Sequence, residues 1–88
     1  MDKVYSTYII ESEKTENWYY GHSDNLERRL NEHNSGQTKS TRGKGPWRLI
    51  FERPFATKLD ANRFELKLKK LKNKEYIKRN YNEFFFGV

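Results

Sequence analysis

The chain has 88 residues, a length that supports one domain with a modest core. Cysteine is absent, which excludes disulfides and thiolate metal sites, and no apolar run approaches the length of a membrane span. Hydrophobic residues make up only 34% of the chain and aromatic residues 16%, so we expect a thin core rich in aromatic rings. We therefore expect a single domain over residues 1–88 in a cytoplasmic protein without a membrane partner.

The formal net charge of +6 lies in the second half of the chain. Residues 1–36 carry four basic and seven acidic side chains, whereas residues 58–80 carry nine basic and three acidic ones. Such an asymmetry favours a polyanionic partner, most often nucleic acid. For residues 67–74 alone, a solvated lysine-rich helix is an equally good interpretation.

Two strands are predicted near the N-terminus. Residues 4–11 are rich in β-branched and aromatic side chains, and the aromatic run 18–20 has the same preference. The polar hexapeptide 12–17 suits a hairpin loop, which predicts an antiparallel pair with Tyr8 and Tyr19 on neighbouring strands.

A short amphipathic helix should follow this hairpin. Asp24 is the expected N-cap, with Glu27 three residues later completing a capping box. Leu26 and Leu30 would form the apolar face, and Gly36 would end the helix in a left-handed conformation.

The same helix brings two polar side chains together. Arg29 and His33 are four residues apart, so their side chains lie on one face and one turn apart. A solvated helix face is the commoner fate of such a pair. The alternative is a catalytic pair, because Arg29 and His33 would stand beside a strand that carries tyrosines.

A third strand is predicted after the basic loop 37–46. Trp47, Leu49 and Phe51 alternate with less apolar residues and should form one strongly apolar face. Pro54 is expected to stop this strand.

Helices should complete the chain. Thr57 is a plausible cap for a helix to about Leu71, with Glu65 at the rim of its buried stripe. A short last helix is expected around residues 76–81. The aromatic tail 84–86 should pack on that helix or close a dimer.

This order of elements and polar residues resembles the GIY-YIG nuclease family, in particular its small single-domain branch. The resemblance covers nearly the whole chain, although Ser6 and Thr7 replace the glycine and isoleucine of the first family motif. The matching segments are Ser6-Thr7-Tyr8, Tyr19-Tyr20-Gly21, residues 25–36, residues 42–47 and residues 61–65.

The resemblance implies an α+β domain, an α/β arrangement in the broad sense, with a three-stranded antiparallel sheet flanked by helices in the order β-β-α-β-α-α. It also implies hydrolysis of a DNA phosphodiester bond with one divalent ion, Mg²⁺ or Mn²⁺. Glu65 would be the only carboxylate on the metal, and Arg29 would clamp the scissile phosphate.

Further catalytic roles follow from the same resemblance. Tyr8 would position or deprotonate the attacking water, which requires the pKa of its phenol to fall below about 10. Tyr19 would share that hydrogen-bond network, and His33 would relay the proton or hold the phosphate. Gly21 would let strand and helix approach. His22 is interpreted as a satisfied turn histidine.

Each of these residues also has a purely structural interpretation. Tyr8 and Tyr19 could be cross-strand packing partners, and Glu65 could pair with Lys69 for only about 0.3–0.5 kcal/mol. Each such interpretation explains one residue or one pair. The joint occurrence of six compatible residues at the spacing of the family favours catalysis, and these residues are Tyr8, Tyr19, Gly21, Arg29, His33 and Glu65.

The expected partner is DNA, with RNA left open, and a partner protein could supply specificity for a repair or recombination structure. The chain itself should be a monomer or a weak homodimer. The alternative function is a catalytically inactive nucleic-acid-binding domain of the same fold. The residues expected to contact nucleic acid are Lys39, Arg42, Lys44, Arg48 and Lys69.

Overall fold

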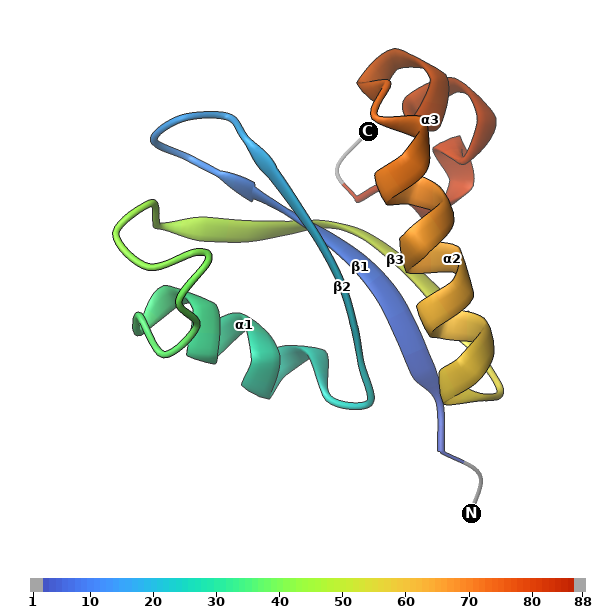
Figure 1. Cartoon of the computed structure of the whole chain (residues 1–88), viewed down its shortest axis with the longest axis horizontal. Helices are drawn as coiled ribbons and strands as arrows, with labels where there is room; N and C mark the ends of the chain where they lie inside the picture. The colour runs from blue at the N-terminus through green and yellow to red at the C-terminus, as the bar shows by residue number, and fades with distance from the viewer. Residues whose placement is uncertain (1–2, 87–88) are drawn as a thin grey trace.

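The computed structural model describes residues 3–86 as one three-stranded sheet with helices on both faces (Figure 1). Strand β1 is central and runs antiparallel to both β2 and β3. This confirms the expected α+β fold and its order of elements. The elements are β1 (Tyr5–Ser12), β2 (Trp18–Ser23), α1 (Leu26–Asn34), β3 (Trp47–Phe55), α2 (Lys58–Leu71), α3 (Lys74–Asn80) and the 3-10 helix η1 (Asn82–Phe84).

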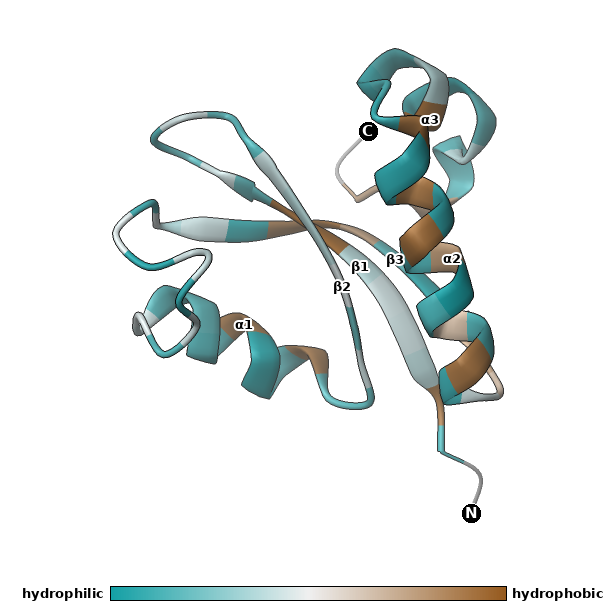
Figure 2. Cartoon of the chain, in the orientation of Figure 1, coloured by the Kyte–Doolittle hydropathy of each residue, from teal (hydrophilic) through white to brown (hydrophobic). Residues whose placement is uncertain are grey.

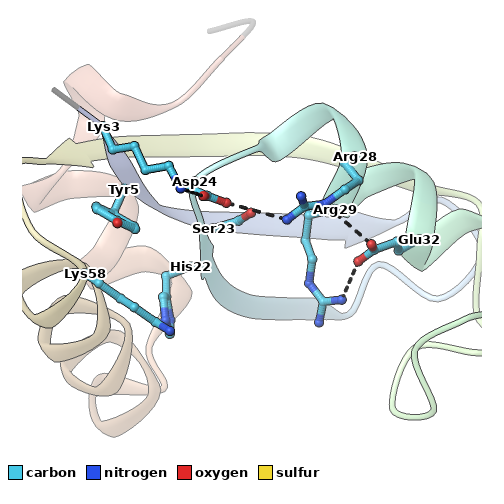
Figure 3. A pocket seen from close by; sticks show the side chains of 9 residues that line it. All are labelled: Lys3, Tyr5, His22, Ser23, Asp24, Arg28, Arg29, Glu32 and Lys58. Carbon is cyan, nitrogen blue, oxygen red and sulfur yellow. Dashed lines mark hydrogen bonds and ion pairs between the residues drawn. The ribbon is translucent and has the colours of Figure 1, made fainter. Parts of the chain in front are cut away.

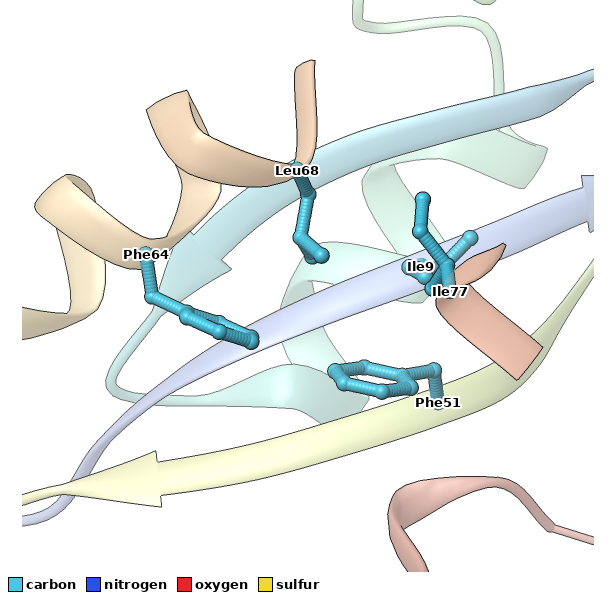
Figure 4. Close-up of a cluster of buried hydrophobic side chains, with 5 residues drawn as sticks. All are labelled: Ile9, Phe51, Phe64, Leu68 and Ile77. Atoms are coloured by element: carbon cyan, nitrogen blue, oxygen red, sulfur yellow. The ribbon is translucent and has the colours of Figure 1, made fainter. Parts of the chain in front are cut away.

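Each face of the sheet has its own apolar cluster, because successive side chains of β1 point in opposite directions. Tyr8 and Ile10 pack toward α1, while Ile9 packs toward α2 and α3. The cluster under α2 and α3 is the larger one and contains Ile9, Phe51, Phe64, Leu68 and Ile77 (Figure 4).

Helix α1 is mostly hydrophilic along its length, whereas α2 carries several hydrophobic residues (Figure 2). Leu26 and Leu30 of α1 are only partly buried against the sheet. Full burial of an aliphatic side chain is worth roughly 1.5–3 kcal/mol, so α2 contributes more to stability than α1. Within residues 3–86, no helix has the length and hydrophobicity needed to cross a bilayer.

The apolar face predicted for the third strand is divided by a β-bulge. Ile9 pairs with Phe51 and Ile10 pairs with Leu49, so Ile50 is the extra residue in β3. The side chains of Trp47 and Leu49 therefore lie on the α1 side, while Phe51 lies under α2. The prediction of one continuous face was wrong because alternation breaks at a bulge.

Pro54 does not stop this strand, which continues to Phe55. Pro54 pairs with Ser6 of β1, and β3 is an edge strand of the sheet. Proline is tolerated on an edge strand because a missing N–H on its outer side breaks no ladder hydrogen bond.

The helix termini match the predictions with one exception. Thr57 caps α2 by accepting the Asp60 N–H, as expected, and Gly36 after α1 has a φ of +80°. Helix α1, however, is capped by Asn25, whose side chain accepts the Arg28 N–H at 3.0 Å. The expected Asp24 cap was wrong because the helix begins one residue later and Asn caps equally well.

The aromatic tail packs against the protein itself. Phe84 and Phe85 contact the cluster under α2 and α3, and Phe85 forms a bridge with Phe51. The Phe86 N–H donates to the Ile50 carbonyl at 2.9 Å, while its ring remains exposed. The tail thus covers part of the outer edge of β3.

Candidate active site

The site is organised around the contact between Tyr8 and Gly21, which are paired across β1 and β2. The Tyr8 phenol lies across the Gly21 backbone, and a Cβ at Gly21 would be 2.5 Å from Tyr8 Cζ. Only glycine permits this approach. Gly21 therefore makes room for a catalytic candidate on the next strand, and not for the strand–helix contact that the sequence predicted.

A chain of hydrogen bonds runs inward from Tyr8. Its hydroxyl lies 2.9 Å from His33 Nε2, and His33 Nδ1 lies 2.8 Å from Thr41 Oγ1. The Thr41 hydroxyl donates to the Thr38 carbonyl, so its oxygen accepts the His33 Nδ1–H. Nε2 is then the acceptor and the Tyr8 hydroxyl the donor. His33 is only 1% exposed, so this arrangement satisfies both of its ring nitrogens.

Burial shifts the pKa values of both partners. It lowers the pKa of His33 to about 4, with the nearby Arg29 acting in the same direction. It also raises the pKa of Tyr8 to about 12, against the opposing effect of Arg29. At neutral pH the pair is therefore a neutral phenol and a neutral imidazole. The lowering of the phenol pKa that the role of Tyr8 requires does not come from Arg29 alone, because desolvation outweighs the effect of this cation.

Arg29 stands beside this pair on α1. Its Nη1 donates to Glu32 Oε1 at 2.8 Å and to Thr38 Oγ1 at 3.3 Å. Burial disfavours the charged guanidinium, but Glu32 and Tyr8 outweigh this and raise the pKa of Arg29. The Arg29 side chain is 30% exposed, so a phosphate can reach it.

Glu65 comes from α2 and is buried, with 8% exposure, rather than at the rim as predicted. Its Oε1 contacts His22 Nδ1 at 2.6 Å, and its Oε2 contacts Lys69 Nζ at 2.5 Å. The Glu65 charge acts on Tyr8, whose pKa it helps to raise. His22, which binds Glu65, lines the same pocket as Arg29, so the carboxylate adjoins the side of the site that holds the phenol.

These side chains approach β2 from its two faces. Tyr8, Tyr19 and His33 lie on the α1 side, while His22 faces α2 and binds Glu65. Alternation along the strand explains the split, because Gly21 and His22 are consecutive residues of β2. From the sequence we also expected Tyr8, Tyr19, Arg29, His33 and Glu65 to converge on one face of the sheet. This expectation is wrong, because Glu65 approaches β2 from the α2 side and the other four residues from the α1 side.

Tyr19 contacts the same imidazole in a different way. Its ring lies edge-on to His33, with centroids 4.8 Å apart. Within residues 3–86 the Tyr19 hydroxyl makes no hydrogen bond to the protein. Tyr19 therefore orients His33 by packing, and its hydroxyl is available to a ligand.

The predicted nucleic-acid contacts fall into separate places. Lys39 and Arg42 lie in the loop after α1, where Arg42 Nε donates to the Gly36 carbonyl at 2.8 Å. Lys44 lies further along the same loop. Lys69 binds Glu65. Arg48 lies on the opposite face of the sheet from Tyr8 and binds Glu11 at 2.8 Å, so the structure does not bring it to the site.

Two residues of the site were missed by sequence reasoning. Alternation along β2 offered a signal for His22, because it places this side chain on the face of the sheet that α2, with Glu65, covers. Thr41 lies in an irregular loop, and its contact with His33 depends on the path of residues 35–46. No local pattern specifies that path.

The donor set fits a hard divalent cation held by one carboxylate. Within residues 3–86, no cluster of three His, Asp or Glu side chains forms a closed metal cage. Glu65 offers carboxylate oxygens beside the site, and both are engaged by cationic or N–H donors. A divalent cation held by Glu65 would have to replace one of these donors.

Comparison with known proteins identifies the family. The sequence model of the GIY-YIG catalytic domain matches residues 4–82. This chain belongs to the GIY-YIG family. It is 39% identical over 69 residues to the UPF0213 protein BH0048 of Halalkalibacterium halodurans, covering 77% of this chain and 72% of that protein. It is 34% identical over 79 residues to the UPF0213 protein OB0043 of Oceanobacillus iheyensis, covering 89% and 91%.

A solved structure agrees with this assignment. The solution NMR structure of the UPF0213 protein BH0048 from Bacillus halodurans has a TM-score of 0.51 and 35% identity, covering 83% of this chain and 78% of that one. Membership of the GIY-YIG family supports nuclease activity and a nucleic acid substrate. The residues at the edge of β2 are the place in this chain to seek that activity.

Proposed function

We propose that this GIY-YIG domain is a divalent-metal-dependent endonuclease that hydrolyses phosphodiester bonds in DNA. The observation that supports it best is that two groups flank β2, with Tyr8, His33 and Arg29 on one side and Glu65, bound to His22, on the other, while His22 and Arg29 line one pocket. Acid–base and phosphate-binding groups thus adjoin a single carboxylate suited to a hard cation.

Arg29 binds the scissile phosphate in this proposal. The negative charge on that phosphate increases toward the transition state, and a guanidinium offers two parallel donors to its oxygens. Glu32 holds Arg29 through a 2.8 Å ion pair in the free protein. The substrate phosphate competes with Glu32 for the same donors.

Tyr8 and His33 handle the proton of the attacking water. The phenol donates to His33 Nε2, so its oxygen has a free lone pair for that water. As the water loses a proton to the Tyr8 oxygen, the phenol proton passes to Nε2, and His33 Nδ1–H remains bonded to Thr41.

Glu65 is the residue that would hold the metal ion. A bound divalent cation supplies charge neutralisation at the phosphate and eases deprotonation of water. Glu65 must release one of its two present partners to do so, and Lys69 is the more exposed of them.

The test is a cleavage panel of duplex, nicked, flapped, branched and single-stranded DNA, with RNA counterparts, in Mg²⁺ or Mn²⁺. Wild type should cut at least one substrate, and chelation should stop cleavage. Glu65→Gln should lower the rate by orders of magnitude while DNA binding is kept. Glu75→Gln, a matched change of an exposed glutamate on α3, should leave the rate unchanged. Binding without cleavage of any substrate would favour the inactive nucleic-acid-binding domain.

A further inference from the structure

An open pocket of about 520 Å³ adjoins the site at the turn between β2 and α1 (Figure 3). His22 and Arg29 line it, so it is continuous with both halves of the site. Its charged walls come from the start of the described chain, from α1 and from the first residue of α2. Four cations and two carboxylates face it, namely Lys3, Arg28, Arg29, Lys58, Asp24 and Glu32.

Arg28 and Arg29 point in different directions because they are consecutive residues of α1. Successive helical residues point about 100° apart, so the two guanidinium groups face different places. Arg29 lies near Tyr8, and its Nη1 donates to Glu32 Oε1 and Thr38 Oγ1. Arg28 lies toward the outer wall of the pocket, 3.5 Å from Asp24 and 3.6 Å from Glu32. Two neighbouring cations thus lead from the site into the pocket.

Lys58 lies at a position where its charge does not stabilise the folded protein. It directly follows the Thr57 cap, in the first turn of α2, where a positive charge opposes the helix dipole and is unfavourable to stability. Within residues 3–86 it has no carboxylate partner. A ligand accounts for this lysine better than helix stability does.

The carboxylates in the pocket are weak competitors for a ligand. Asp24 contacts Lys3 at 3.0 Å and Arg28 at 3.5 Å, and both cationic side chains are more than half exposed. Exposed ion pairs of this kind contribute about 0–1 kcal/mol. A phosphate carries three acceptor oxygens on one centre and can replace Asp24 at several donors together.

We propose that this pocket binds the backbone phosphate next to the scissile phosphate on the same nucleic acid strand, through Lys3, Arg28 and Lys58. This inference rests on the proposed function, because a scissile phosphate and its neighbour on the same strand exist only if the protein cleaves nucleic acid. Binding of an anion in the pocket does not depend on cleavage. The pocket would fix the register of the substrate on Arg29.

The first experiment titrates inorganic phosphate into the metal-free full chain and follows backbone amides by NMR. Saturable shifts are expected at Ser23, Arg28 and Lys58. Lys58→Ala should weaken the apparent affinity roughly three- to tenfold. Lys70→Ala removes the same charge from the exposed face of α2, outside the pocket, and should leave the affinity unchanged. Equal affinities in wild type and Lys58→Ala would overturn the proposal.

The second experiment uses substrates in which one phosphate is replaced by an uncharged methylphosphonate. After the cut site is mapped, neutralising one linkage beside it should raise KM and leave kcat nearly unchanged. On that substrate Lys58→Ala should have no further effect, whereas on the unmodified strand it should raise KM roughly three- to tenfold. An equal effect of Lys58→Ala on both substrates contradicts adjacency. Failure of wild type to cut anything, with phosphate shifts intact, rejects the nuclease and keeps the anion site.

Discussion

The Tyr8 phenol crosses the backbone of Gly21 so closely that a Cβ at residue 21 would overlap it, 2.5 Å from Cζ. A side chain of β1 thus crosses the neighbouring strand β2, and its hydroxyl meets His33 of α1. The position of the Tyr8 ring therefore depends on the absence of a side chain at residue 21.

The first prediction concerns this contact between Tyr8 and Gly21. Gly21→Ala should lower the free energy of unfolding by roughly 1–3 kcal/mol, because the methyl group forces the Tyr8 ring to move. Urea unfolding measures the change. In a Tyr8→Leu background the same substitution should lose most of its effect, since the ring is gone. Additive losses in the double variant would mean that the backbone of β2, and not Tyr8, requires glycine.

The second prediction concerns the hydrogen bond from Tyr8 to His33. Tyr8→Phe removes the donor and leaves Nε2 buried without a partner, which should destabilise the protein by about 1–3 kcal/mol. Cleavage should also fall steeply, because the water loses its acceptor. Tyr76→Phe makes the same change at an exposed tyrosine of α3 and should alter neither quantity by much. Wild-type turnover by Tyr8→Phe would remove the phenol from the mechanism.

The third prediction is a pH dependence of stability. The pKa of His33 is about 4 in the folded protein and about 6.5 in an unfolded chain. Between these values the unfolded state binds a proton that the folded state does not, so stability falls as pH falls from 6.5 to 4. The loss should reach about 3 kcal/mol and stop below pH 4.

Comparison with His33→Gln isolates this effect. Glutamine can accept from Tyr8 but does not titrate, and carboxylates affect both proteins alike. The difference between the two curves of unfolding free energy against pH should follow His33 alone. Parallel curves from pH 7 to pH 4 would show that His33 is protonated as easily in the fold as outside it.

Much of the fold could be predicted because its signals are local. The aromatic run at 18–20, the polar loop before it and the Thr57 cap specify the hairpin and α2. The bulge at Ile50 has no local signal, because it depends on how β1 and β3 pair around two different clusters. Tertiary contacts also decided the burial of Glu65, whose partner His22 is 43 residues away in the chain.

The fourth prediction tests the loop after α1. Replacing Lys39, Arg42 and Lys44 by alanine should weaken DNA binding, because fewer phosphates are then neutralised by the protein. The slope of log K against log salt should become shallower by about 0.9 for each phosphate that the loop no longer neutralises. Arg48→Ala is the control, since Arg48 binds Glu11 on the far face of the sheet. An unchanged slope in the triple variant would place the loop away from the DNA backbone.

The last prediction concerns the competition for Glu65. Lys69 Nζ lies 2.5 Å from Glu65 Oε2, so a metal ion at this oxygen must displace the lysine. Lys69→Gln should therefore tighten Mn²⁺ binding, by about two- to fivefold if the pair is worth roughly 0.4–1 kcal/mol. Water proton relaxation in a Mn²⁺ titration measures the affinity, and Glu65→Gln should abolish the binding.

Lys70→Gln makes the matched comparison, because it removes an equal charge one residue away on the exposed face of α2. Tighter Mn²⁺ binding in both variants would reflect net charge alone. Tighter binding in Lys69→Gln only would identify Lys69 as the residue that occupies the metal's oxygen in the free protein. If Lys69→Gln instead leaves Mn²⁺ binding unchanged and weakens DNA binding without metal more than Lys70→Gln does, Lys69 is the phosphate contact that the sequence predicted, and Glu65 binds the ion through its other oxygen.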